Sequence, residues 1–222
     1  MMMSLFSVFD PVSYFGISLN WVVMFFVIMM IPMSYYLVGG FTSGLWMNFS
    51  GSLSNMYKDV SFPNFSGLVM ISSILFFFIS IMNVIGLFPF VFTASGHVIV
   101  TLSMGLILWM MSMSMGWIKD FSKSSAHLVP EGAPLILSPF MVIIEFVSHM
   151  IRPLTLSVRL AANMMAGHLI LGLIASVSLY SFSSFWMSVV AQSVMLVLEW
   201  AVCFIQAFVF SILVMLYALD YY

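Results

Sequence analysis

Long apolar stretches constrain this chain more than any other feature of its sequence. A helix needs about 20 apolar residues to cross the hydrocarbon core of a bilayer, which is about 30 Å thick. Five stretches reach that length, and they cover residues 17–38, 67–92, 98–118, 135–179 and 185–219. Only 5% of the residues are charged, against about 25% in an ordinary soluble domain. We therefore predict one all-α integral membrane domain over residues 1–222, with about five spanning helices.

The scarcity of charge also excludes several functions. Five dispersed cations cannot neutralise a track of phosphates, so we expect no nucleic-acid partner. Cys203 is the only cysteine, and the sequence has no motif that binds phosphate or metal and no nucleophile elbow. We expect neither a cofactor nor a metal, and no catalysis by the chain alone. Residues 1–10 contain no Lys or Arg, so we expect no cleaved leader.

Residues 41–57 differ from the spans because polar side chains interrupt them. The apolar positions recur at spacings of three and four, and they are Phe41, Leu45, Phe49, Leu53 and Met56. This period is typical of an amphipathic helix, and the segment is too polar to span. We expect it to lie flat on the membrane surface. An irregular loop is the alternative, because Gly44 and Gly51 weaken a helix.

The last two stretches, 135–179 and 185–219, predict a long helical hairpin. Forty-five residues of helix would measure about 68 Å, more than twice the thickness of the hydrocarbon core. We therefore expect two steeply inclined antiparallel helices, joined by a short link at 181–184. Pro139 and Pro153 offer positions for kinks. A broken or re-entrant pair is the alternative.

Three lysines predict the orientation in the membrane. Lys58 lies in the first loop, and Lys119 and Lys123 lie in the third, which is on the same side when the spans alternate. Loops on the cytoplasmic or matrix side carry an excess of Lys and Arg. We expect the N-terminus on the outer side and, after five crossings, the C-terminus on the inner side.

Ionisable and amide side chains concentrate on the last two predicted helices. Each residue of a helix advances by about 100°, so polar residues at suitable spacings share one face. The first helix carries one such stripe, formed by Glu145, Ser148, Arg152, Arg159 and Asn163. The second carries a stripe at multiples of seven residues, formed by Gln192, Glu199, Gln206 and Asp220. The two stripes would face each other if the hairpin packs closely.

Such groups at membrane depth suit proton transfer. Glu and His exchange protons at accessible pH, whereas arginine cannot release its proton. Arg159 would therefore be a barrier in a proton path or the partner of a carboxylate on another subunit; a structural role is the alternative. His168 points to the side of its helix opposite Arg159. Glu145 and Arg152 are seven residues apart, which we expect to be too far for a direct bond, and Arg152 could snorkel or bind lipid.

The run from 151 to 168, IRPLTLSVRLAANMMAGH, closely resembles the signature of subunit a of F-type ATP synthase in its mitochondrial form. The Pro-Glu-Gly-Ala-Pro run at 130–134 and the region of Glu145 resemble that family too. The resemblance implies that Arg159 is the essential arginine, which faces the carboxylates of a ring of c subunits. It also implies a proton path formed by Glu145, Asn163, His168, Glu199 and Gln206.

The resemblance further implies a mechanism, a location and partners. Two half-channels would reach the middle of the membrane from opposite sides without meeting, with His168 and Glu199 on the outer one and Glu145 on the exit side. The location would be the mitochondrial inner membrane, with the N-terminus in the intermembrane space and the C-terminus in the matrix. The partners would be the c-subunit ring, other FO and peripheral-stalk subunits, and bilayer lipids, with cardiolipin as a candidate. The absence of an oxygen-ligand cluster favours H⁺ over Na⁺.

Two other classes of function stay open on the sequence alone. A structural or quinone-binding subunit of a respiratory complex would predict that neutralising Glu199 or His168 leaves proton flux through ATP synthase untouched. A self-contained channel would predict ion conduction by the purified chain without any ring.

Overall fold

All the regular structure in the described part of the chain is helical. The computed structural model describes residues 9–12, 18–30, 40–61, 66–88, 91–119, 121–127, 129, 137–178 and 181–220. The helices are η2 (Leu19–Trp21), α1 (Val22–Met30), α2 (Phe41–Val60), α3 (Ser66–Gly86), η3 (Ala94–Gly96), α4 (Val98–Lys119), α5 (Phe121–His127), α6 (Ser138–Val177) and α7 (Phe182–Asp220). Among them α3, α4, α6 and α7 are long and apolar enough to cross a membrane. The predicted all-α membrane fold is confirmed.

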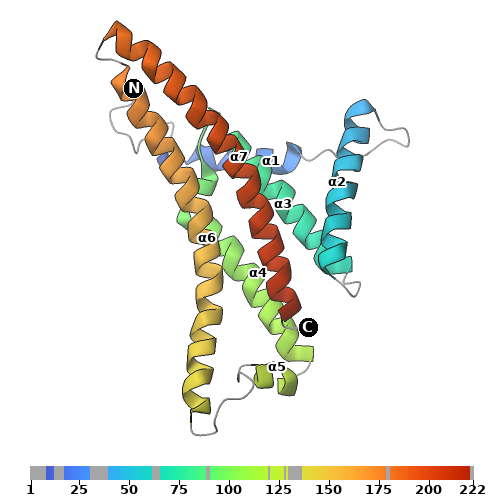
Figure 1. Cartoon of the computed structure of the whole chain (residues 1–222). Helices are drawn as coiled ribbons and strands as arrows, with labels where there is room; N and C mark the ends of the chain where they lie inside the picture. The colour runs from blue at the N-terminus through green and yellow to red at the C-terminus, as the bar shows by residue number, and fades with distance from the viewer. Residues whose placement is uncertain are drawn as a thin grey trace.

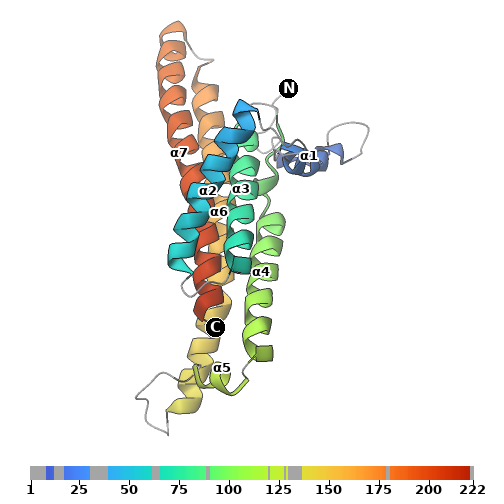
Figure 2. The same cartoon turned by 90° about the vertical axis from the view of Figure 1, so that its right-hand side faces the viewer.

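The four long helices pack as an up-and-down bundle around the α6–α7 hairpin. Helix α3 packs against α7, and α4 packs against α6 (Figures 1 and 2). The end of α6 and the start of α7 extend beyond the other helices at one end, and α5 and the start of α6 lie at the other (Figure 1). The last described turn of α7 lies toward the same end as α5, in agreement with the predicted alternation of the spans.

A hydrophobic core joins the hairpin to α2 and α3. Its buried residues are Leu53, Tyr57, Val69, Phe76, Phe77, Ile79, Leu156, Leu160, Ala207, Phe210 and Met215. Large apolar side chains on the outside are strongly exposed, as in Ile118 at 85% and Ile99 at 80%. Since a protein in water rarely exposes so much apolar surface, this outer face suits contact with lipid or with other membrane subunits.

The hairpin consists of two unbroken helices, so the alternative of a broken pair is wrong. Helix α6 has 40 residues and continues through Pro153, and α7 has 39; at 1.5 Å per residue each is about 60 Å long. Pro139 lies in the first turn of α6. Backbone N–H groups in the first turn of a helix have no acceptor within the helix, so a proline there breaks no hydrogen bond and produces no kink. The expectation of a kink at Pro139 is therefore wrong.

The predicted link at 181–184 belongs largely to α7. The Ser181 backbone N–H donates to Ser184 Oγ at 2.9 Å, and the Ser184 N–H donates to Ser181 Oγ at 3.3 Å. This reciprocal capping satisfies two backbone donors and starts the helix at Phe182 rather than at 185.

The predicted span 67–92 is too long. Helix α3 ends at Gly86, and Leu87 and Phe88 form a turn. The sequence continues with Pro89, and a proline disfavours the helical conformation of the residue before it. The chain then places η3 against α6 and α3, so the apolar stretch ends in a packed turn rather than in further helix.

The predicted span 17–38 is described only over residues 18–30. Helix α1 lies there across the direction of α3 (Figure 1). Residues 31–39 lie outside the described part, and the fifth span stays a prediction. The Pro-Glu-Gly-Ala-Pro run at 130–134 also lies outside it.

Residues 41–60 form a helix, so the loop alternative is wrong. Helix α2 lies alongside α3 (Figure 2), and the rings of Trp46 and Phe49 lie 4.4 and 5.9 Å from that of Phe77. Of the predicted apolar stripe, Leu53 is buried and Phe41 is 82% exposed. Its place on the membrane surface stays a prediction.

Candidate functional site

The seam between α6 and α7 brings the two predicted polar stripes together. Asn163 Nδ2 donates to Gln206 Oε1 at 3.2 Å, and Met164 Sδ lies 3.8 Å from Cys203 Sγ. Because the two helices are antiparallel, residues later in α6 than these contacts lie beside residues earlier in α7. The predicted facing of the stripes is confirmed at Asn163 and Gln206.

Arg159 lies on α6 four residues before Asn163, and its side chain is exposed. Its neighbours Leu160 and Ala161 turn inward and are buried. Within the described residues the Arg159 guanidinium has no hydrogen bond and no ion pair. A mid-span arginine costs about 2.5–3.5 kcal/mol even on lenient scales, so this position calls for a partner outside the chain.

Glu199 is enclosed where α7 meets α6. Both of its carboxyl oxygens are buried and have no hydrogen-bond partner among the described residues. The carboxyl group lies against the backbone of Gly167, where an added Cβ would lie 2.8 Å from Glu199 Cδ. Buried polar atoms in proteins are nearly always bonded to protein or to ordered water. The Glu199 carboxyl group therefore marks a place for water or for a proton.

His168 follows Gly167 and faces away from Arg159, as predicted. Its ring lies near the Gly86 backbone, and the ring of Phe9 lies edge-on at 6.2 Å. Its Nε2 is buried without a partner within the described chain. His168 and Glu199 thus form no hydrogen bond with each other, and each keeps an open polar atom.

Asn83 is a polar residue to which the sequence analysis assigned no role. It is 1% exposed, and both atoms of its amide lack a partner in the described part of the chain. Ser72, on the same face of α3, lies against Met215 at 3.9 Å. Eleven residues further along the antiparallel pair, this register sets Asn83 level with Phe204, between Glu199 and Gln206. A buried amide in an apolar span was the signal that could have found it.

A second polar cluster lies nearer the start of α6. Glu145 Oε1 lies 3.3 Å from His149 Nε2 and 4.0 Å from Arg152 Nη2. The expectation that Glu145 and Arg152 are too far apart for a direct interaction is wrong, because two long side chains reach across two helical turns. The Arg152 guanidinium also lies 5.4 Å from the centre of the Tyr217 ring on α7. Sequence reasoning missed His149, although its i, i+4 spacing from Glu145 was the signal.

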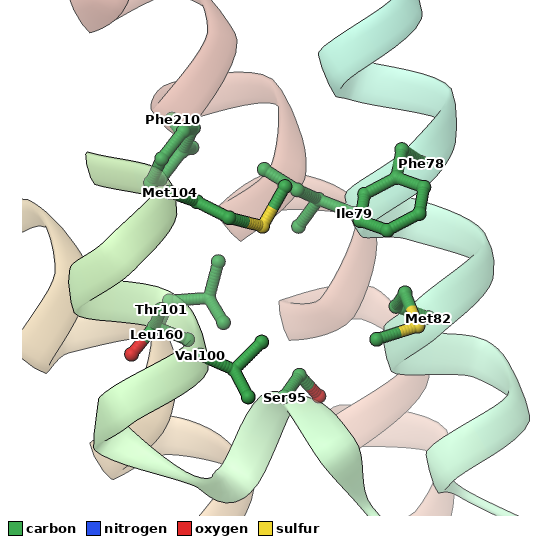
Figure 3. A pocket seen from close by; sticks show the side chains of 9 residues that line it. All are labelled: Phe78, Ile79, Met82, Ser95, Val100, Thr101, Met104, Leu160 and Phe210. Carbon is green, nitrogen blue, oxygen red and sulfur yellow. The ribbon is translucent and has the colours of Figure 1, made fainter. Parts of the chain in front are cut away.

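A small, nearly apolar cavity lies behind the seam between α6 and α7. Figure 3 shows Ile79, Met82 and Met104 around it, together with Ser95 and Thr101. Its volume of about 20 Å³ is enough for one water. Thr101 donates to the carbonyl of Val98, which leaves little to bind a ligand. The cavity is a packing gap rather than a site.

Comparison with known proteins identifies the family. The model of the family described as "ATP synthase A chain" matches residues 14–218. ATP synthase subunit a of Drosophila yakuba is 44% identical over 220 residues, which cover 98% of each chain. The proteins of that name from Locusta migratoria and Anopheles gambiae are 41% and 42% identical over 225 and 224 residues. They cover 100% and 98% of both chains.

These relatives are full-length matches, so the likeness extends well beyond the signature run. The apolar helices and the insect relatives together identify a multi-pass protein of the mitochondrial inner membrane. The chain therefore belongs to the ATP synthase A chain family, the proton-conducting membrane subunits of F-type ATP synthase, which are not catalytic alone.

Proposed function

We propose that this subunit loads and unloads protons on the carboxylates of a c-subunit ring through two half-channels that do not meet. Arg159 lies between the half-channels and faces the ring. The single observation that carries the proposal is the exposed Arg159 guanidinium, without a partner in the described chain, on the α6–α7 seam. A ring carboxylate on the neighbouring subunit is the partner that its charge requires.

The outer half-channel runs along the α3–α6–α7 junction. Polar atoms there are buried and unpartnered within the described residues, and they belong to Asn83, His168, Glu199 and Gln206. So many open donors and acceptors in an apolar bundle would be costly unless water joins them. We propose that such waters carry protons from the intermembrane space past His168 and Glu199 to the ring.

The exit half-channel uses the second cluster. Glu145 bonds to His149 nearer the start of α6, at the end of the bundle where α5 lies. With the predicted orientation this end faces the matrix, the C-terminus lies in the matrix and the N-terminus lies in the intermembrane space. A carboxylate beside a histidine can accept a proton from the ring and pass it on.

Arg159 keeps the two half-channels separate. Arginine stays protonated, so it cannot pass a proton across the gap. It stabilises the ionised form of a ring carboxylate, which makes the proton leave on the exit side. A proton must then travel around with the ring, and each elementary charge that crosses 100 mV supplies about 2.3 kcal/mol to rotation.

The partners follow from this function. We propose that the ring of c subunits lies against the Arg159 face of the hairpin, and that other FO and peripheral-stalk subunits cover other faces. Bilayer lipids, with cardiolipin as a candidate, cover the remaining apolar surface. Family membership sets aside the alternative of a respiratory-complex subunit.

Proton-driven ATP synthesis in inner-membrane vesicles tests the proposal. Arg159→Ala should abolish synthesis while the complex still assembles, because the guanidinium makes no bond within the described chain that holds the fold. Lys58→Ala is the control, since it removes an exposed cation from α2, outside both half-channels, and it should retain synthesis. Normal synthesis in Arg159→Ala would refute the proposal. Ion conduction by the purified chain in liposomes would favour a self-contained channel instead.

A further inference from the structure

Gly167 stands where α6 meets the Glu199 carboxyl group. A Cβ at this position would lie 2.8 Å from Glu199 Cδ and 3.3 Å from its Cγ, and it would collide with Oε1. The contact lies on the seam that Asn163 and Gln206 continue at 3.2 Å. The carboxyl group therefore occupies the space that any larger residue at 167 would fill.

We propose that Gly167 is a positioning residue for Glu199: the missing side chain forms a socket against the α6 backbone that holds the carboxyl group beside His168. The inference rests on the proposed proton path through Glu199. Gly167 does not itself carry a proton or contact the ring. It acts only by determining where the Glu199 carboxyl group lies.

Shape rather than hydrogen bonding holds this carboxyl group. Both oxygens of Glu199 are buried, and no donor in the described part of the chain fixes their direction. What limits the side chain is the space available at the α6 backbone. Glycine in the middle of a helix weakens it, and the socket explains why α6 has one directly before His168.

The contacts of Gly167 indicate that an alanine there would move the Glu199 carboxyl group without disturbing the packing of α6 against α7. An alanine at 167 would meet the far end of a flexible side chain rather than a backbone. The Glu199 side chain can swing away, so α6 and α7 need not move apart, and alanine is the better helix former. We therefore expect Gly167→Ala to assemble normally and to misplace the carboxyl group. Since a misplacement of about 1 Å can cost roughly 10²-fold in rate, we expect at least about a tenfold loss of coupled proton flux.

The test is a rescue in the intact ATP synthase of inner-membrane vesicles, with proton-driven ATP synthesis and the amount of assembled complex measured together. Four chains are compared: the parent, Gly167→Ala, Glu199→Asp and the double variant. Aspartate is one methylene shorter, so its carboxyl group withdraws from the new methyl. The double variant should synthesise ATP several times faster than Gly167→Ala. If Gly167 had a purely structural role, the losses of ATP synthesis caused by the two substitutions would add, and the double variant would have the lowest rate of the four chains.

Two other glycines serve as controls. Gly67→Ala adds a methyl group where no atom lies within 4 Å, and Gly105→Ala adds one 3.4 Å from the Pro153 carbonyl oxygen between α4 and α6. Both should retain synthesis. Full synthesis in Gly167→Ala, or no recovery in the double variant, overturns the inference. Glu199→Gln separates it from the proposed function: full synthesis in that variant would refute the proton path itself, whatever Gly167 does.

Discussion

Tyr57 holds α2 against α7 through one buried hydrogen bond to Ser211. Removing the hydroxyl of Tyr57 and removing that of Ser211 should have unequal effects on this docking. Tyr57 is 1% exposed and Ser211 is fully buried, and their side-chain oxygens lie 2.5 Å apart. Ser211 Oγ donates its single hydrogen to the Phe208 carbonyl at 2.9 Å. Tyr57 is therefore the donor in the shared bond, and Ser211 is the acceptor.

The magnitudes follow from that direction. Tyr57→Phe removes the donor and leaves the Ser211 hydroxyl with its own donated bond, so the docking of α2 should lose about 1 kcal/mol. Ser211→Ala leaves the Tyr57 hydroxyl buried without an acceptor, and the loss should be larger, about 2 kcal/mol. The double variant buries no unpaired donor and should be milder than Ser211→Ala alone.

Hydrogen exchange of the α2 amides in the intact complex measures this free energy. Exchange should accelerate about fivefold in Tyr57→Phe and about thirtyfold in Ser211→Ala, by the usual conversion of about 1.4 kcal/mol per factor of ten. Ser52→Ala is a matched control, because that exposed hydroxyl bonds only to Phe49 of its own helix. Equal effects of the two variants, or a smaller effect of Ser211→Ala, would refute the reasoning.

Three more predictions concern the same helices. Burial raises the pKa of Tyr57 above its ordinary 10.0. The docking of α2 should therefore be fully stable below pH 10 and be lost as the pH rises through the higher pKa of the folded state. Hydrogen exchange of α2 as a function of pH measures this loss, and Tyr57→Phe should remove the pH dependence. In a double-mutant cycle of Asn163→Ala and Gln206→Ala, thermal unfolding of the complex should give a coupling of about 0.6 kcal/mol, whereas zero coupling would mean no bond. Asn83→Leu should preserve thermal stability, since it removes two unpartnered buried atoms, but lower ATP synthesis several-fold; unchanged synthesis would exclude Asn83 from the channel.

Much of the bundle could be predicted because its pattern is local to each stretch of sequence. The length of the apolar runs predicts α6 and α7, and the period of seven predicts that Gln206 faces the partner helix. The ends of helices depend on single residues instead. The apolar run continues to 92 although α3 ends at Gly86 before Pro89, and α7 begins early because Ser181 caps it.

The site was only partly predictable, because its geometry depends on the register between helices. Spacing along α6 placed Arg159 and Asn163 on one stripe and His168 on the other side. Nothing along one helix indicates that the Glu199 carboxyl group stands opposite Gly167, or that Asn83 lies level with Phe204. Those relations come from the contacts of α7 with α6 and α3.

The position of Arg159 in a density map of the intact ATP synthase tests the proposed mechanism most directly. The Arg159 guanidinium should lie within about 4 Å of the carboxylate of a passing c subunit, the distance of an ion pair, with density for water along Asn83, His168 and Glu199. A map with Arg159 in lipid, or with Arg152 in its place against the ring, would contradict the proposed role of Arg159.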